Sequence, residues 1–222
     1  ADDAVRDVAR VVEDALPGLP PLPGKFGFAV DCGPRRVLRA VSADIRVERS
    51  TDGMLLVRAD GMENGWRTDA IGLPEAIRIL VGVFVTLGGG RNGATRMADL
   101  LRGALTAETS RFAGLGPTRA TPVEDGNMPL PGLYPEGALV GFAFGQTDAA
   151  TLAALARLGP IRLTPWRMVL VEGLNRMPDL SGLITDPDDP LRRVIACTGA
   201  PHCPQGLAPT RPLARALAAS VP

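Results

Sequence analysis

The sequence predicts a mixed α/β (α+β) protein with more than one domain. Hydrophobic residues make up 45% of the 222 residues, enough to form a buried core, and 24 basic side chains balance 24 acidic ones. Apolar residues recur at helical spacing in some segments and alternate in others, so helices and strands follow one another. A glycine- and proline-rich stretch, Gly114 to Pro135, separates two such series and is the predicted domain boundary.

Before that boundary, the patterns predict helices and strands in turn. The predicted elements are a helix over 5–16, a β-prone run over 25–31, hairpin strands over 43–48 and 54–59, and helices over 73–87 and about 95–108. The segment 73–87 is ambiguous, because its β-branched residues favour a strand. Its length and Pro74 near its start favour a helix, which we predict.

After the boundary, the predicted order is β-α-β-β, followed by a terminal helix. The predicted elements are a strand over 137–144, a helix over 147–158 that Thr147 or Asp148 opens, strands over 161–164 and 168–171, and a helix beginning at Thr210. A β-α-β-β unit is half of a ferredoxin-like fold and normally needs a second copy to complete its sheet. In the last helix, Leu213, Leu217 and Val221 share one face.

Cys197-Thr-Gly-Ala-Pro-His-Cys203 is the most informative motif. Gly199 and Pro201 allow the chain to curl so that both sulfurs face one point, as ligands of an iron-sulfur cluster do. Two other interpretations stay open at this stage: a pair of ordinary buried cysteines, and a zinc site that also uses His202. The third cysteine, Cys32, is expected to be structural.

Other features mainly exclude functions. The balanced charge gives no broad attraction to nucleic acid or to a membrane surface, and three cysteines do not form a secreted disulfide framework. The longest apolar run, 77–87, is too short to span a bilayer, and the acidic N-terminus is no signal peptide, so we expect a soluble cytoplasmic protein. The chain lacks an initiator Met, so we expect a processed chain or a piece of a longer one. Gly88, Gly90 and Gly93 match a dinucleotide-binding spacing, but the helix predicted before them argues for an ordinary helix-terminal turn.

Four segments, in this order, carry a resemblance to a known family. They are Leu22-Pro-Gly-Lys-Phe-Gly-Phe-Ala-Val-Asp31, Ala43-Asp-Ile-Arg-Val47, Ile161-Arg-Leu-Thr-Pro-Trp-Arg167 and Ala196-Cys-Thr-Gly-Ala-Pro-His-Cys203. Together they resemble the sulfite/nitrite reductase superfamily and, within it, the precorrin-3B synthase family. The resemblance implies three parts: a nitrite/sulfite reductase-like α/β domain over 1–135, a ferredoxin-like half domain over 136–176, and the beginning of an iron-sulfur cluster domain over 177–222.

The resemblance also implies an activity and a site. A member of this branch is an oxidoreductase of cobalamin biosynthesis, a monooxygenase that converts precorrin-3A to precorrin-3B with a 4Fe-4S cluster; siroheme and non-haem iron are further candidate cofactors. Cys197 and Cys203 would be cluster ligands, and Lys25, the only lysine, and Arg167 would be catalytic. Arg46 and Arg162 would bind substrate, since guanidinium groups suit the carboxylates of a tetrapyrrole.

The sequence departs from the family pattern at three points. The reductases carry a second lysine two residues after the first, where this chain has Gly27, so the precorrin branch is favoured over a siroheme-dependent nitrite or sulfite reductase. A second cysteine pair, C-x-x-x-C, and the N-terminal ferredoxin-like half are also missing. We therefore expect a fragment or a split subunit that is inactive alone and needs a complementary chain and an unidentified electron donor. A hypothesis from another functional class is a non-catalytic module that binds a tetrapyrrole or a partner chain.

Overall fold

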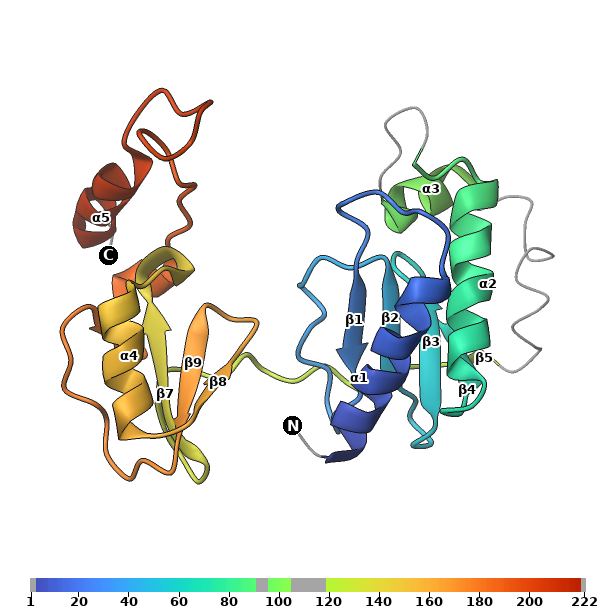
Figure 1. The fold of residues 1–222 in the computed structure, drawn as a ribbon, viewed down its shortest axis with the longest axis horizontal. Helices are drawn as coiled ribbons and strands as arrows, with labels where there is room; N and C mark the ends of the chain where they lie inside the picture. Colours follow the sequence, from blue (N-terminus) through green and yellow to red (C-terminus); the bar gives the residue numbers. More distant parts are fainter. Residues whose placement is uncertain (1–2, 91–95, 105–118, 221–222) are drawn as a thin grey trace. The chain divides into compact units, whose positions relative to one another are not determined.

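The computed structural model describes residues 3–90, 96–104 and 119–220. The chain divides into two compact units, Ala1–Asn127 and Met128–Pro222 (Figure 1). Each unit has its own sheet and its own hydrophobic core. No helix among the described residues is both long enough and apolar enough to cross a membrane.

The described part of the first unit is a five-stranded sheet with three α-helices. Its elements are α1 (Asp3–Ala15), the 3-10 turn η1 (Leu16–Gly18), β1 (Phe28–Asp31), β2 (Ile45–Arg49), β3 (Leu55–Ala59), β4 (Gly65–Thr68), α2 (Leu73–Thr86), α3 (Met97–Ala104) and β5 (Arg119–Ala120). The strands lie in the order β1-β2-β3-β4-β5, with β1 parallel to β2 and every other pair antiparallel. Helices α1 and α2 cover one face of this sheet (Figure 1).

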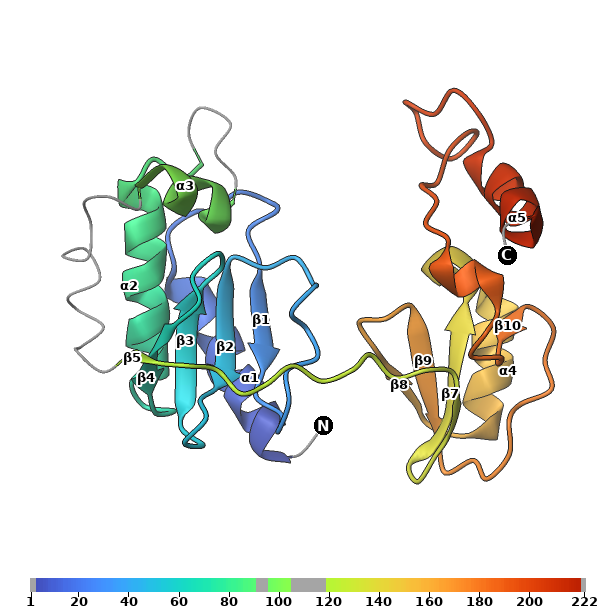
Figure 2. The same cartoon turned by 180° about the vertical axis from the view of Figure 1, so that it is seen from behind.

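The two faces of β2 and β3 carry different chemistry. Ile45, Val47 and Val57 are fully buried in the core under the helices. The alternate positions place charged side chains, including Arg46 and Arg58, on the opposite face. The segment that follows β5 runs across this second face (Figure 2), so the charged side chains there are also buried.

The second unit is built around an antiparallel sheet with α4 packed on it. Its elements are β6 (Gly132–Tyr134), β7 (Gly137–Phe142), the 3-10 turn η3 (Ala143–Gly145), α4 (Ala149–Leu158), β8 (Ile161–Leu163), β9 (Met168–Glu172), β10 (Leu183–Ile184), the 3-10 turn η4 (Pro190–Arg193) and α5 (Thr210–Ser220). The strand order is β10-β7-β9-β8, and β6 also pairs with β7. Leu155 of α4 is fully buried in a core with Val140 and Val171. The carboxylate of Asp148 caps α4 by accepting from the Thr151 N–H at 2.6 Å.

Most predicted elements are confirmed. The first helix, the β2–β3 hairpin, the helical choice for α2 and the β-α-β-β order all agree with the structure, whereas the short strands β4, β5, β6 and β10 were not predicted. The helix predicted over 95–108 is confirmed over Met97–Ala104 as α3, and residues 95 and 105–108 lie outside the described part of the chain. The predicted domains 136–176 and 177–222 both fall within the second unit.

The face of α5 that carries the leucines is exposed. Leu213 and Leu217 are 59% and 55% exposed, and the buried side chains are Ala214 and Ala218. The helix packs through small residues near η4, so its leucines face outward. Val221 lies outside the described residues.

Candidate functional site

Cys197 and Cys203 lie on the loop between η4 and α5, which hydrogen bonds fold into a tight turn. The N–H of Cys203 donates to the carbonyl of Gly199 at 2.8 Å, and the N–H of Gly206 donates to the carbonyl of Cys203 at 2.9 Å. Gly199 has φ 64°, and a Cβ at this position would lie 2.5 Å from Thr210 Oγ1. Glycine is therefore required at position 199 by both the left-handed backbone and the close approach of the start of α5.

The environment of Cys197 favours the thiolate. Its side chain is exposed, and the Thr210 hydroxyl lies 3.6 Å from the sulfur while donating to the Cys197 carbonyl at 2.8 Å. The hydrogen bond with Thr210, followed by a backbone hydrogen bond from Gly199, lowers the pKa of the Cys197 thiol, and the Arg211 charge acts in the same direction. The thiolate is the form in which a cysteine binds metal, and the role of Cys197 as a ligand stays a prediction.

The donor set of this loop consists of two thiols. Cys203 is half-buried and His202 is exposed. Among the residues that the structure describes, no three His, Cys, Asp or Glu side chains gather closely enough to hold a metal ion. The assignment of Cys197 and Cys203 as half of the cysteine ligands of an iron-sulfur cluster stays a prediction.

Cys32 has the opposite environment, in the first unit. It is 2% exposed, and its thiol donates to the Val47 carbonyl at 3.5 Å. Burial raises the pKa of this thiol to about 11, so it remains neutral at physiological pH. A structural thiol was predicted here, and these properties agree with that role.

A pocket rich in aromatic and arginine side chains lies in the second unit. Phe144, Trp166, Arg167 and Arg192 are among the residues that line it, and the lining includes no acidic side chain. Phe144 (φ 60°) and Arg167 (φ 61°) have left-handed backbones, which are uncommon for residues other than glycine. A strained backbone of this kind costs about 1–3 kcal/mol and persists only where the surrounding structure holds it in place.

The structure connects the cysteine loop to this pocket through α5. Arg211 donates to the side-chain carbonyl of Gln146 and, at 3.4 Å, to the hydroxyl of Thr198, which follows Cys197. One turn later, the Arg215 guanidinium lies 5.3 Å from the centre of the Phe144 ring, in a cation–π contact. The loop that carries the thiols is therefore held against the turn that carries the pocket's Phe144.

Lys25 lies in the first unit, on a segment that a buried carboxylate fixes. Asp44 is fully buried, and its carboxylate accepts from the N–H groups of Gly27 at 2.9 Å and Met97 at 2.8 Å and pairs with Arg96 at 3.2 Å. Arg96 also donates to the carbonyl of Lys25 at 2.5 Å. The backbone of Lys25 is thus held in place while its side chain remains exposed.

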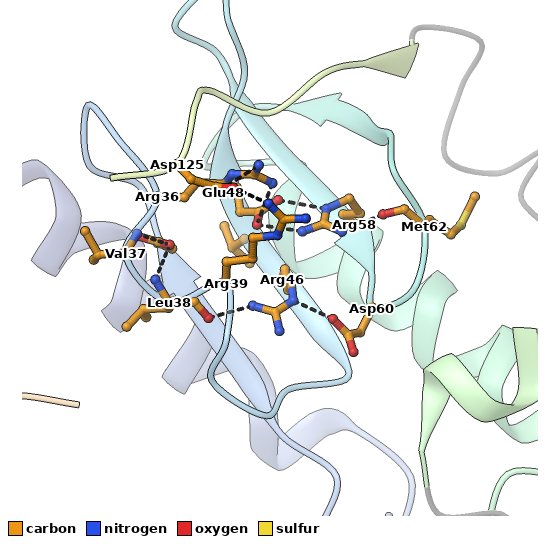
Figure 3. A network of polar contacts seen from close by, with 12 residues as sticks. Arg36, Val37, Leu38, Arg39, Arg46, Glu48, Arg58, Asp60, Met62 and Asp125 are labelled. Atoms are coloured by element: carbon orange, nitrogen blue, oxygen red, sulfur yellow. Dashed lines mark hydrogen bonds and ion pairs between the residues drawn. The ribbon is translucent and has the colours of Figure 1, made fainter. Parts of the chain in front are cut away.

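Arg46 lies on the helix-free face of the first sheet, in a network of ion pairs (Figure 3). Its guanidinium donates to Asp60 at 2.6 Å and to the carbonyls of Leu38 at 3.0 Å and Val41 at 2.7 Å. These bonds tie the loop after β1 to the end of β3. The predicted substrate contact of Arg46 stays a prediction, and a guanidinium keeps further N–H groups beyond those used here.

The other two predicted arginines differ in their partners. Arg162 on β8 pairs with Glu172 on β9, with 2.8 Å between Nε and the carboxylate. Arg167 makes no side-chain hydrogen bond or ion pair within the described part of the chain, and its stem packs on Gly145, where an added Cβ would lie 2.9 Å from Arg167 Cγ. Arg167 is thus the predicted site residue whose guanidinium is available to a ligand.

Sequence reasoning missed two residues that organise these sites. Asp44 stands inside a segment that was recognised, yet its partners are 17 and 53 residues away in the sequence. Arg211 was assigned no role, and its partner Gln146 is 65 residues away. Asp44 directly precedes β2, which itself carries Arg46, Glu48 and Arg49, so its charge gave no distinctive signal in the sequence.

The glycines that match the dinucleotide-binding spacing form an ordinary turn. Gly88 (φ 88°) and Gly90 (φ 80°) directly follow α2. A helix, and not a strand, precedes them, as predicted. Gly93 lies outside the described residues.

The fold is a mixed α/β fold of the nitrite/sulfite reductase type. Among solved structures, it is similar to that of the Mycobacterium tuberculosis NirA protein, a sulfite/nitrite reductase, with a TM-score of 0.50 and 22% sequence identity. The match covers 80% of this chain and 40% of the NirA chain. No family model matches the sequence, and no curated protein matches it significantly.

Proposed function

We propose that this chain is part of an oxidoreductase of the precorrin-3B synthase type, in which Cys197 and Cys203 supply half of the ligands of a 4Fe-4S cluster. The observation that carries this proposal is the cysteine loop, which α5 holds against an arginine-rich pocket in the same unit. The reductase-type fold of the chain supports the same class of chemistry. The remaining cluster ligands would come from polypeptide beyond these 222 residues, from a complementary chain or from an added thiol.

In this proposal a tetrapyrrole that carries carboxylates binds over the mouth of the pocket, because the pocket itself, about 40 Å³, holds little more than a water molecule. Arg167 and Arg192 provide guanidinium groups that bind carboxylates, and Phe144 and Trp166 provide flat apolar faces for a macrocycle. In the proposed oxygen-dependent reaction, precorrin-3A becomes precorrin-3B. One oxygen atom enters the substrate and the other leaves as water, with a pair of electrons from a donor outside this chain.

The chain's own residues would bind and position the reactants. When bound, the cluster supplies one-electron transfer. Thr210 fixes the orientation of Cys197, and the guanidinium of Arg211 adds positive charge next to an anionic group. Free thiols at these positions suit a reducing compartment, and we place the protein in the cytoplasm.

Anaerobic reconstitution with iron, sulfide and an exogenous thiol tests the cluster. We expect visible absorption together with bound iron and acid-labile sulfide, and their loss in Cys197→Ser and Cys203→Ser. Cys32→Ala is the matched control, because this cysteine is buried in the other unit and should leave the iron content unchanged. A colourless protein that binds zinc at the two cysteines, or equal iron contents in all variants, would contradict the proposal.

Quenching of Trp166 fluorescence by a carboxylate-rich porphyrin such as uroporphyrin tests the pocket. Arg167→Gln should weaken binding by about tenfold, the effect of one charge-assisted hydrogen bond. Arg176→Gln is the control, since this exposed arginine of the same unit does not line the pocket. If the two variants bound the porphyrin with equal affinity, Arg167 would not be part of the binding site.

A siroheme-dependent nitrite or sulfite reductase is the second candidate, and the similarity to NirA favours it. Gly27 argues against it. The sulfite and nitrite reductases that the chain resembles carry their second lysine at this position, whereas glycine has no charge. Siroheme uptake, with sulfite or nitrite binding that depends on Lys25, would favour this candidate. Tetrapyrrole binding without either anion would favour the precorrin branch.

A further inference from the structure

Three arginines gather at the turn formed by η3 and the residue that follows it. They come from the position before β9 and from α5, and each contacts one of three consecutive residues of the turn. The contacts are those of Arg215 with Phe144, of Arg167 with Gly145 and of Arg211 with Gln146. None of the three arginines makes an ion pair within the described part of the chain.

The N–H groups of two of these arginines are used differently. Arg211 donates to the side-chain carbonyl of Gln146 and to the hydroxyl of Thr198, so it is committed to holding the cysteine loop. The guanidinium of Arg215 lies 5.3 Å from the centre of the Phe144 ring, in a cation–π contact that uses no N–H group. Arg215 is exposed and makes no hydrogen bond to the described residues. Since a guanidinium has five N–H donors, Arg215 can bind an acceptor outside the protein.

Two acids near this turn accept hydrogen bonds from the backbone. The carboxylate of Asp148 accepts from the Thr151 N–H at 2.6 Å and caps α4. The carboxylate of Asp189 accepts from the Leu191 N–H at 2.8 Å and caps η4. Neither acid forms an ion pair with an arginine among the described residues. Both acids remain charged, so it is the set of free N–H donors, and not an excess of charge, that makes Arg215 available to a ligand.

Phe144 connects Arg215 to the pocket of the second unit, because Phe144 is part of the pocket lining. The pocket, about 40 Å³, is far smaller than a tetrapyrrole, so a macrocycle lying on Phe144 and Trp166 would keep its peripheral carboxylates outside it. Arg167 in the lining and Arg215 beside it can then receive these carboxylates at the rim. We infer that Arg215 is a substrate-binding residue that, together with Arg167, selects tetrapyrroles by their carboxylates. This inference rests on the proposed tetrapyrrole site and adds the basis of its selectivity.

Two porphyrins that differ in their number of carboxylates test this residue, with quenching of Trp166 fluorescence as the measure of affinity. Uroporphyrin carries more carboxylates than mesoporphyrin on the same macrocycle. Arg215→Gln should weaken uroporphyrin binding by about fivefold, as expected for one exposed charge pair, and mesoporphyrin binding by less than about twofold. The affinity of this variant for uroporphyrin should also depend less on sodium chloride than that of the wild type. Arg157→Gln is the matched control, because this exposed arginine lies at the end of α4 that is remote from η3.

The outcomes distinguish a failure of this inference from a failure of the proposed tetrapyrrole site. If the wild type binds neither porphyrin, the tetrapyrrole site is wrong, and the role of Arg215 is wrong with it. If the wild type binds uroporphyrin and Arg215→Gln binds it as well as Arg157→Gln does, the tetrapyrrole site stands and the inference is overturned. Equal weakening of both porphyrins, with an unchanged salt dependence, would show that Arg215 only holds Phe144 in position, and this result would also overturn the inference.

Discussion

Asp44 offers a sharp test of how the first unit is held together, because one buried carboxylate joins three segments. Asp44→Ala removes the acceptor of two N–H groups, those of Gly27 and Met97, and the ion-pair partner of Arg96. Each buried N–H left without an acceptor costs about 1–2 kcal/mol. Arg96 is 24% exposed, so water solvates its guanidinium in the variant, and the lost ion pair with Asp44 costs about 1 kcal/mol. We therefore expect the free energy of unfolding to fall by about 3–5 kcal/mol.

Urea denaturation followed by Trp66 fluorescence measures this loss. Trp66 is buried in the first unit and Trp166 lies in the second, so a Trp166→Phe background reports the first unit alone. Asp44→Asn keeps one acceptor oxygen and should lose about half as much. Asp7→Ala is the control, because its ion pair on α1 is fully at the surface and should contribute less than about 0.5 kcal/mol.

The reasoning would be refuted by a small effect at Asp44. If Asp44→Ala lowers the free energy of unfolding by less than about 1 kcal/mol, the two N–H groups must find water or other acceptors. The backbone of Lys25 would then not depend on this carboxylate. A loss equal to that of Asp7→Ala would lead to the same conclusion.

Three further variants test other parts of the structure. Gly27→Lys should change the free energy of unfolding by less than about 1 kcal/mol in urea titrations, because a Cβ there meets its nearest atom at 3.8 Å; a larger loss would mean that glycine is required. Thr210→Val should raise the pKa of the Cys197 thiol and therefore slow its alkylation at neutral pH, measured by mass spectrometry. Thr210→Ser keeps the hydroxyl and should retain the wild-type rate. An unchanged rate in the valine variant would show that the hydroxyl does not lower this pKa. Leu155→Ala should destabilise the second unit by about 3 kcal/mol in hydrogen exchange, and Leu152→Ala, 38% exposed on the same helix, by under about 1 kcal/mol; similar losses would contradict the assigned core.

The elements that the sequence predicts well are those with signals inside a few residues. Pro17 and Gly18 end α1, and the turn at Gly53 (φ 84°) joins the hairpin strands β2 and β3. Asp148 caps α4 from the adjacent position. Each of these signals acts through local backbone geometry, so no knowledge of the tertiary structure is needed.

The missed elements depend on distant partners. β5 and β10 have two residues each, too few to show a period, and they are strands because they pair with β4 and β7. The buried face of α5 also depends on distant partners. Helical spacing shows that Leu213 and Leu217 share a face, but the neighbouring segments decide which face is buried.

The residues of the candidate site likewise fall into those that a local motif reveals and those whose partners are distant in the sequence. The cysteine pair was evident because both residues and Gly199 lie in one short motif. Asp44 and Arg211 act across long sequence separations, and no local pattern identifies their partners. The left-handed backbone at Arg167, whose side chain packs on Gly145, is equally hidden in the sequence.

Anomalous diffraction at the iron edge, from crystals of the reconstituted protein, tests most directly whether the cysteine loop holds iron. The account predicts iron peaks within bonding distance of the sulfurs of both Cys197 and Cys203. Iron bound elsewhere, or a zinc signal in its place at these two sulfurs, would contradict it.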